Sequence, residues 1–254
     1  MAISIRSFFT NIICGLIPSR DLRHRVRVFL NNPSCRLYIR FVREWAEKNR
    51  GGVRKIKISL GCGCQNLVVL LNDSDVFKFP LHSGGNELAQ RELRIYSALR
   101  TITPIPMPSM EIIHWRGLVV RRYEFIRGKL LCDFPTDSVL VHREHLAKQL
   151  ANFMYIIGCA DPTQIRDIKP SKTSRPGFMY GWFHNDIGQN FLMDDDMNII
   201  CFLDWENTQF CDFRESLRHA ERFWNKNGYR GLMTDVLSQY SRLYYSSQGQ
   251  FLGE

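Results

Sequence analysis

The chain has 254 residues, 44% of them hydrophobic and 23% charged, which is the composition of an ordinary globular protein with a sizeable core. Its net charge of +9 is unevenly placed, because residues 1–57 carry 13 Lys or Arg and 3 Asp or Glu, whereas residues 58–254 carry 21 and 22. A nucleic-acid enzyme needs positive charge around its working groove, so the neutral remainder of the chain argues against a nucleic-acid partner.

Cysteine usage argues against a disulfide framework. The eight cysteines form no CxxC pair, and several lie within apolar runs where they would pack as small hydrophobes. Cys62 and Cys64 are the one close pair, and no second Cys or His pair follows at zinc-ligand spacing. We therefore expect reduced thiols in a cytoplasmic protein without a zinc site.

The basic N-terminal region has helical periodicity. Residues 3–17 place apolar side chains on one face, but the run is too short to span a bilayer, and its charges follow the apolar part, unlike those of a signal peptide. Arginines continue from there through a second predicted helix at 36–49. We predict that residues 1–50 form a basic amphipathic extension and that residues 1–45 contact an anionic membrane surface. The alternative is a helix that packs on its own domain with a solvated basic face.

A glycine pair at 51–52 marks a boundary, and a predicted hairpin follows. Residues 55–60 and 67–71 have strand character, and the turn between them contains Gly61 and Gly63. Glycines at such a tip let backbone amides approach phosphate oxygens. The alternative is a turn without a ligand, since most glycine pairs in hairpins have no other role.

The next strand contains a lysine in an apolar setting. Alternation over residues 76–80 places Lys78 on the face opposite Phe77 and Phe79. An amphipathic helix is predicted over 86–100, and its Glu92 lies at a distance along the chain from which it could pair with Lys78. In the alternative, Glu92 is a surface residue that pairs with Arg91 or Arg94.

A proline-rich connector then leads to two more strands, at 110–113 and 117–126. Five strands with one helix inserted after the third predict a small antiparallel lobe over residues 51–126. The remainder, 127–254, is predicted to be mainly helical, with helices near 142–159, 212–226 and 231–246. The fold class is therefore α+β.

Polar side chains gather in the stretch 184–206. His184, Asp186 and Asn190 lie on a predicted loop, and the apolar run 199–203 delivers Asp204. Carboxylate and amide oxygens of this kind suit Mg²⁺, which binds proteins through a few such ligands together with substrate phosphates. Alternatively, these residues are ordinary turn formers, since Asp and Asn favour turns.

The order of these features resembles a known family. A glycine-tipped hairpin, a strand lysine, a helix glutamate, an acidic-aromatic strand end, HxD…N and an Asp after an apolar strand together resemble the protein-kinase-like superfamily. HND followed by LDWE is similar to the H-x-D-x-x-x-x-N and [IL]-D-[WF]-E motifs of its aminoglycoside phosphotransferase and choline kinase branch. The resemblance covers residues 55–220.

The resemblance implies a bilobal fold that binds ATP and Mg²⁺. Lys78, oriented by Glu92, is expected to hold the α- and β-phosphates beneath the loop of Gly61 and Gly63. The strand end at 123–125, with Glu124 and Phe125, is expected to form the hinge that meets adenine. Asp186 is expected to be the catalytic base, and His184 is expected to brace its loop. Asn190 and Asp204 are expected to bind Mg²⁺.

Two positions depart from the family pattern. Asn190 follows Asp186 by four residues, where the family has five, and Glu206 stands where protein kinases have a glycine. The second departure favours the small-molecule branch. We expect an ATP-dependent phosphotransferase that acts on a hydroxyl of a small molecule, sugar or lipid-linked saccharide, with a protein kinase or an inactive pseudokinase-like binding module as alternatives.

The acceptor is not specified by any motif, and one short similarity bears on it. Residues 16–27 are similar to N-terminal segments of bacterial surface-polysaccharide enzymes, which suggests a glycan acceptor. With the basic N-terminus, this predicts a cytoplasmic enzyme at the inner face of the membrane.

Overall fold

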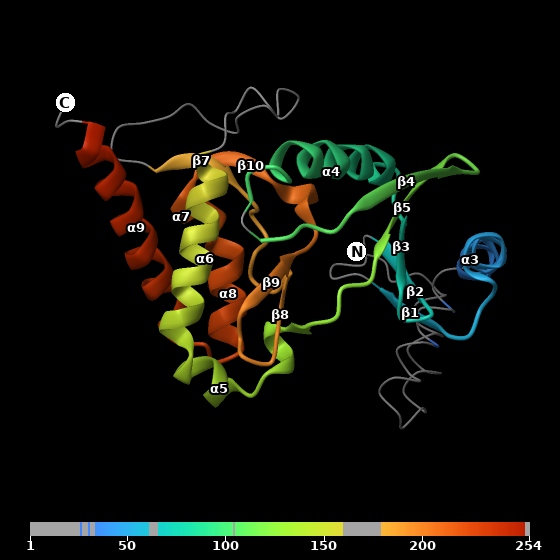
Figure 1. Cartoon of the computed structure of the whole chain (residues 1–254), viewed down its shortest axis with the longest axis horizontal. Helices are drawn as coiled ribbons and strands as arrows, with labels where there is room; N and C mark the ends of the chain where they lie inside the picture. The colour runs from blue at the N-terminus through green and yellow to red at the C-terminus, as the bar shows by residue number, and fades with distance from the viewer. Residues whose placement is uncertain are drawn as a thin grey trace, which may run out of the picture. The chain divides into compact units, whose positions relative to one another are not determined.

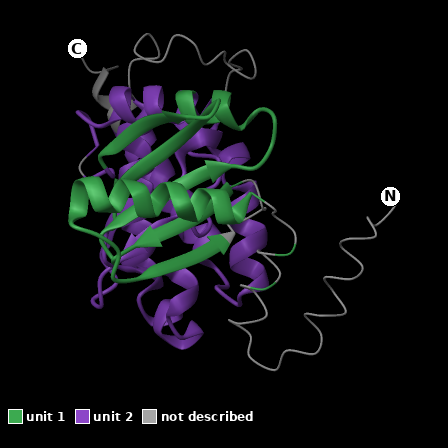
Figure 2. Cartoon of the chain, turned by 90° about the vertical axis from the view of Figure 1, so that its right-hand side faces the viewer, with its two compact units in different colours: residues 1–90, 109–125 green, residues 91–108, 126–254 purple. Residues whose placement is uncertain are grey.

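The structure is a computed structural model that describes residues 26, 30, 34–60, 66–103, 105–159 and 179–251. Gly61, Gly63 and the apolar segment 3–17 lie outside the described residues. The chain divides into two compact units, one of residues 1–90 and 109–125 and the other of residues 91–108 and 126–254 (Figure 2). The three segments expected from the sequence, 1–50, 51–126 and 127–254, stay predictions.

The first unit is built on an antiparallel sheet with strand order β1-β2-β3-β5-β4. Its strands are β1 (Ile56–Leu60), β2 (Asn66–Leu71), β3 (Asp75–Pro80), β4 (Met110–Trp115) and β5 (Leu118–Glu124). Helix α4 (Gly85–Leu99) follows the third strand, begins in this unit and ends in the second. The predicted small antiparallel lobe with one inserted helix is confirmed.

Helix α4 begins at Gly85, one residue before the start predicted from the sequence, so Asn86 lies within the first turn. The Asn86 side chain instead donates to Gly117 O at 2.7 Å and accepts from Val119 N at 2.8 Å. Asn86 therefore ties the helix to the β4-β5 turn.

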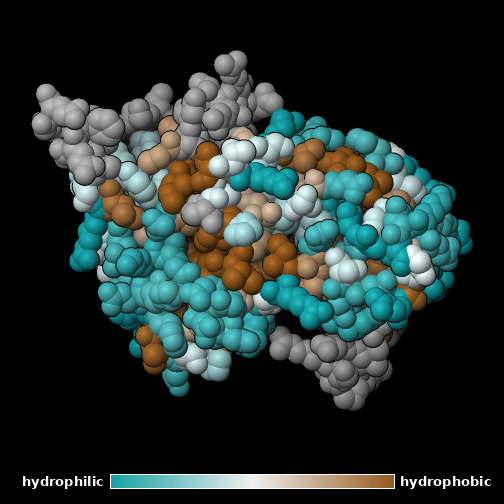
Figure 3. All heavy atoms as spheres, viewed as in Figure 1, coloured by the Kyte–Doolittle hydropathy of each residue, from teal (hydrophilic) through white to brown (hydrophobic). Residues whose placement is uncertain are grey.

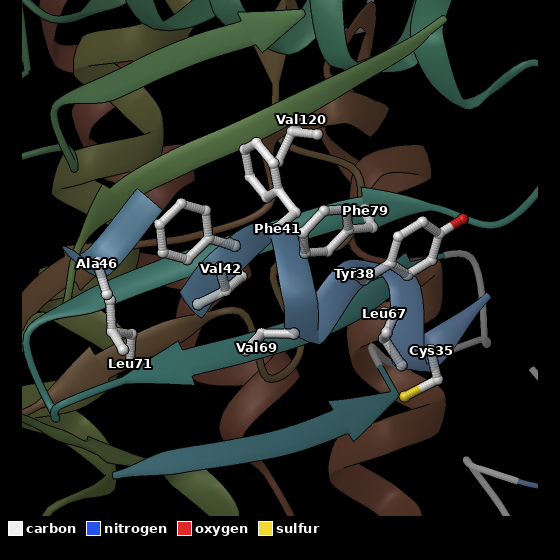
Figure 4. Close-up of a cluster of buried hydrophobic side chains, with 11 residues drawn as sticks. Cys35, Tyr38, Phe41, Val42, Ala46, Leu67, Val69, Leu71, Phe79 and Val120 are labelled. Carbon is white, nitrogen blue, oxygen red and sulfur yellow. The ribbon is translucent and has the colours of Figure 1, made fainter. Parts of the chain in front are cut away.

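Helix α3 (Cys35–Arg50) covers one face of this sheet (Figure 4). Its buried residues recur at helical spacing, and Tyr38 stacks on Phe79 with ring centroids 4.5 Å apart. The arginines at 36, 40 and 43 are exposed on the other side of the helix. This arrangement is the one expected of a helix that packs on its own domain with a solvated basic face.

A buried carboxylate joins the end of α3 to the sheet. Asp75, which is fully buried, accepts hydrogen bonds from Arg50 Nε at 3.1 Å and from Arg122 Nε at 2.9 Å. Both guanidinium groups also lie over the ring of Trp45. These contacts outweigh the cost of burial and hold the pKa of Asp75 below its usual range.

The second unit is mainly helical (Figure 1). Its helices are α5 (Thr136–Val141), α6 (Arg143–Gly158), α7 (Phe213–Ser216), α8 (Arg218–Lys226) and α9 (Leu232–Phe251), and α6 packs against α9. Two small antiparallel sheets accompany them, one of β6 (Lys129–Leu130), β8 (Phe191–Met193) and β9 (Ile199–Phe202), the other of β7 (Tyr180–Phe183) and β10 (Gln209–Asp212).

The helix predicted over 212–226 is instead two helices that meet at Leu217. Leu217 is fully buried, and its carbonyl accepts the Glu221 N–H as the second helix begins. Hydrophobic periodicity persists across this junction, which explains why the sequence pattern does not reveal the break.

Among the described residues, no helix is long and apolar enough to cross a membrane. In the face drawn in Figure 3, hydrophilic residues cover much of the described surface, and patches of hydrophobic residues lie between them.

Candidate functional site

The candidate catalytic loop begins directly after β7. His184 is fully buried there, and its Nε2 lies 2.6 Å from Leu203 O, while its Nδ1 lies 3.3 Å from the Asp186 N–H. The carbonyl can only accept and the amide can only donate, so the imidazole is neutral with its proton on Nε2. His184 therefore joins the loop that carries Asp186 to the strand end that carries Asp204.

Asp204 follows β9 in a left-handed backbone conformation, with φ 58° and ψ 57°. Such a conformation is uncommon for a residue with a side chain, and Asp is among the residues that tolerate it. The preceding Leu203 N–H donates to Asn190 O at 2.8 Å, next to the pair formed by Phe191 and Phe202 in the β8-β9 ladder. Asn190 and Asp204 are thus held on adjacent chain segments.

The loop from Asp186 to Asn190, which is one residue shorter than in the family pattern, is closed by a hydrogen bond between its ends. Asn190 is nearly buried, and its Nδ2 donates to Asp186 O at 2.8 Å. This bond closes the turn from Asp186 to Asn190, and β8 begins at the next residue. The shorter loop is therefore a closed turn with both side chains in one small region.

Asp186 lies in an environment that disfavours its charge. Burial raises the pKa of Asp186 from its ordinary value, and the nearby carboxylates of Asp204 and Glu206 act in the same direction. A hydrogen bond with Asn190 and the charge of His219 act in the opposite direction. A carboxyl group with a raised pKa beside two other acids is a common feature of functional sites.

Helix α4 fixes the loop that follows Asp204 through two adjacent residues. Glu92 is buried, and its Oε1 accepts the Trp205 N–H at 3.1 Å. Arg91 donates to Glu206 O at 2.7 Å and to Thr208 O. The reading of Glu92 as an ordinary surface residue is therefore wrong. Its pairing with Lys78 stays a prediction.

In the first unit, Lys78 is buried in the middle of β3. Phe77 and Phe79 belong to the core beneath α3, so Lys78 points to the opposite face of the sheet. Its cross-strand partner is Arg121, which is fully buried and donates to Asn66 Oδ1. Two cationic side chains thus lie side by side on the face that the sequence assigns to nucleotide phosphates.

The predicted hinge residues lie at the end of β5. Glu124 pairs with Asp75 in the β3-β5 ladder, and the Phe125 N–H donates to Ser74 O at 2.8 Å. Both Glu124 and Phe125 are exposed. Their contact with adenine stays a prediction, and Gly61 and Gly63 lie outside the described residues.

The donor set fits a magnesium ion. Within the described residues, no group of three or more His, Cys, Asp and Glu side chains has an arrangement that could hold a metal on its own. Mg²⁺ with a nucleotide needs only one or two carboxylates, because phosphates and water supply the other ligands. The mutual repulsion of Asp186, Asp204 and Glu206 is also of the kind that a divalent cation relieves.

Sequence reasoning overlooked Asp212, which fixes the start of β7, the strand that leads into the catalytic loop. Its buried carboxylate accepts the Met179 N–H at 2.9 Å and the Arg214 N–H at 3.0 Å, so it joins the start of β7 to the start of α7. An Asp followed by Phe213 and the helical Arg214 is a recognisable helix N-cap, and this pattern could have identified it. Arg91, which holds the backbone after Asp204, shows no comparable signal in the sequence.

Comparison with solved structures gives strong matches to antibiotic phosphotransferases. The aminoglycoside phosphotransferase APH(2")-IIia, in its complex with GDP and kanamycin, has a TM-score of 0.66 and 14% identity, with 81% of this chain and 83% of that chain covered. Macrolide 2'-phosphotransferase type I has a TM-score of 0.55 and 12% identity, over 80% and 81% of the two chains. For the apoenzyme of macrolide 2'-phosphotransferase MphH from Brachybacterium faecium, the values are 0.54 and 14%, over 84% and 93%.

No protein-family model matches the sequence, and no curated protein matches it at the required significance. At identities this low, the structural matches establish the fold alone. The chain therefore has the protein-kinase-like fold of the aminoglycoside and macrolide phosphotransferases, and the resemblance predicted from its motifs is confirmed at that level.

Proposed function

We propose that the protein is an ATP-dependent phosphotransferase that transfers the γ-phosphate to a hydroxyl group of a small molecule, sugar or lipid-linked saccharide. The observation that carries this proposal is that one set of hydrogen bonds holds the segments of both Asp186 and Asp204. His184 bonds to Leu203 O and Leu203 N bonds to Asn190 O, so the two carboxylates extend from a single braced pair of loops. Structural neighbours bound to GDP, ATP or ADP support a nucleotide donor.

In this proposal, Asp186 orients the acceptor hydroxyl and accepts its proton as the new bond from oxygen to the γ-phosphorus forms. The bond between that phosphorus and the bridging oxygen breaks, and ADP leaves. Lys78 binds the α- and β-phosphates. Asp204 and Asn190 would hold Mg²⁺, which supplies positive charge against the developing phosphate charge.

The raised pKa of Asp186 supports its role as a base, because a more basic carboxylate accepts a proton more readily. Glu206 supports a small-molecule acceptor, since its carboxylate occupies a position that is glycine in protein kinases.

The turn between β8 and β9 offers a control aspartate for the mutational test. This turn is at the opposite end of the hairpin from Asn190, and it is held by hydrogen bonds to Asp194 within the turn itself.

The test is Mg²⁺-dependent ADP release in a screen of sugars, aminoglycosides, choline and lipid-linked saccharides. Asp186→Ala and Asp204→Ala should each lower turnover by roughly 10²–10⁴-fold, whereas Asp196→Ala, an exposed aspartate in the β8-β9 turn, should leave it unchanged. Unchanged turnover in both site variants would refute the proposal. Phosphate incorporation into proteins but not sugars would favour the protein-kinase alternative, and ATP binding without Mg²⁺ dependence or transfer would favour a binding module.

We also propose that the basic N-terminal region brings the enzyme to an anionic membrane surface at the inner face of the membrane. The exposed arginines of α3 and the charge excess in residues 1–57 support this location. A membrane-linked glycan would be an acceptor accessible from there.

A further inference from the structure

Helix α8 packs directly against the candidate catalytic loop. Trp224 Nε1 donates to Gly188 O at 2.9 Å, two residues beyond Asp186. A Cβ added to Gly188 would lie 3.0 Å from Ala220 Cα and 3.3 Å from Phe223 Cβ. The loop and the helix are therefore in close contact at this point, and residues on the neighbouring part of α8 border the region where an acceptor hydroxyl must approach Asp186.

The exposed side of α8 carries a row of basic residues. His219, Arg222 and Lys226 are all exposed and follow one another at intervals of three and four residues, which places them on one face of the helix. We call these three residues the basic ridge. The helix has one carboxylate, Glu221, which lies about 200° around the helix from His219. No carboxylate of the helix thus interrupts the ridge, and its two permanent positive charges are those of Arg222 and Lys226.

The end of the ridge at His219 is close to the candidate base. His219 is near enough to Asp186 for its charge to oppose the pKa increase that burial causes there. The acidic groups that act on Asp186 are Asp204 and Glu206, and both belong to the segment that α4 fixes rather than to α8. The residue of α8 that acts on Asp186 is therefore the basic His219, at one end of the ridge.

We propose that the basic ridge binds an anionic group of the acceptor, so that the preferred acceptor is a saccharide with a phosphate or carboxylate group. This inference rests on the proposed phosphotransferase function and concerns the acceptor of that same site. Arginine binds both kinds of anion through paired hydrogen bonds. The kanamycin bound to the structural neighbour is instead a polyamine that is cationic at neutral pH, and a basic ridge would repel such a molecule.

The test measures acceptor binding by calorimetry in the full-length protein saturated with Mg²⁺ and a non-hydrolysable ATP analogue. The probes are glucose 1,6-bisphosphate, glucuronic acid, neutral glucose and kanamycin. We expect at least one anionic sugar to bind about tenfold or more tightly than glucose, and kanamycin to bind more weakly than either anion. The two anionic probes distinguish phosphate from carboxylate recognition.

The variant Arg222→Glu should weaken binding of the anionic sugar by about tenfold or more and leave the affinity for the nucleotide analogue unchanged. Lys148→Glu, at an exposed position on α6, is the control for a change in net charge and should bind as the wild type does. The inference would be overturned if kanamycin bound as tightly as the tighter-binding anionic sugar, or more tightly. It would also be overturned if Lys148→Glu weakened anionic-sugar binding as much as the ridge variant does, or if neither anionic sugar bound. Failure of the wild type to bind the nucleotide analogue would instead contradict the proposed function.

Discussion

We expect the ionised Asp186 side chain to lower the stability of the folded protein, although the same charge serves the proposed reaction. Its folded-state pKa is raised, first by burial and then by neighbouring carboxylates, so the folded protein binds this proton more tightly than the unfolded chain does. The associated stability is present at acidic pH and declines as the pH rises through the folded pKa. At neutral pH, the ionised side chain therefore destabilises the fold.

We predict that Asp186→Asn stabilises the nucleotide-free protein at neutral pH by on the order of 1 kcal/mol, which would raise the melting temperature by about 2–4 °C. The melting temperature is measured by calorimetry in the presence of a chelator, so that no metal compensates the carboxylates. The difference from wild type should shrink as the pH is lowered. Asp196→Asn should leave the melting temperature unchanged, and a lower melting temperature for Asp186→Asn would contradict the argument.

The contacts of the site that the sequence indicates and those that it does not indicate differ in the distance along the chain between their partners. His184, Asp186 and Asp204 lie within 21 consecutive residues, and the β8-β9 hairpin between them brings Asp204 back to the catalytic loop. The bonds from Glu92 to Trp205 and from Arg91 to Glu206 join residues that are 113 and 115 positions apart. Hydrophobic periodicity predicts the helix that carries Glu92 and Arg91 but not the backbone groups that they contact.

Helix α3 shows the same difference between what local sequence predicts and what depends on distant residues. Its periodicity predicts an amphipathic helix with nearly correct ends, yet a membrane and a sheet are equally suitable partners for its apolar face. The choice depends on the complementary aromatic surface of β3, where Phe77 and Phe79 contact the ring of Phe41. That complementarity is a property of the assembled sheet.

The ion pairs of Asp75 should be important for joining α3 to the sheet. Asp75→Asn removes the charge that Arg50 and Arg122 share, and it leaves the arginines beside an amide that has donors of its own. Because Arg50 remains partly exposed, we discount the cost of breaking a buried pair and expect a loss of about 2–4 kcal/mol. Urea unfolding followed by circular dichroism measures this loss.

Asp73→Asn is the matched control, because Asp73 pairs with Lys55 and Lys57 at a solvent-screened site, and this substitution should change the stability little. The pKa of Asp75 is lowered, so its contribution is present above the ordinary carboxyl pKa and is lost as the pH falls through the folded value. The difference between the Asp75 variant and wild type should therefore disappear in acid. Equal destabilisation by the two variants would show that the buried pairs have no special role.

The distribution of charge over the whole chain bears on where the enzyme works. The basic excess lies within residues 1–57, and the described part of that region uses the apolar face of α3 for its own core. The helix therefore offers a membrane only its exposed arginines. Attraction of this kind contributes about 1 kcal/mol per basic residue near an anionic surface and is screened by salt.

We predict that the full-length protein sediments with vesicles of phosphatidylcholine and phosphatidylserine in about 0.05 M salt and is released in about 0.5 M salt. Arg40→Glu, at an exposed position of α3, should weaken the association by about tenfold or more because it replaces an attractive charge with a repulsive one. Lys148→Glu makes the same change in net charge on α6 and should have little effect. Sedimentation that persists in high salt would mean that apolar insertion, rather than the basic face of α3, holds the protein on the vesicle.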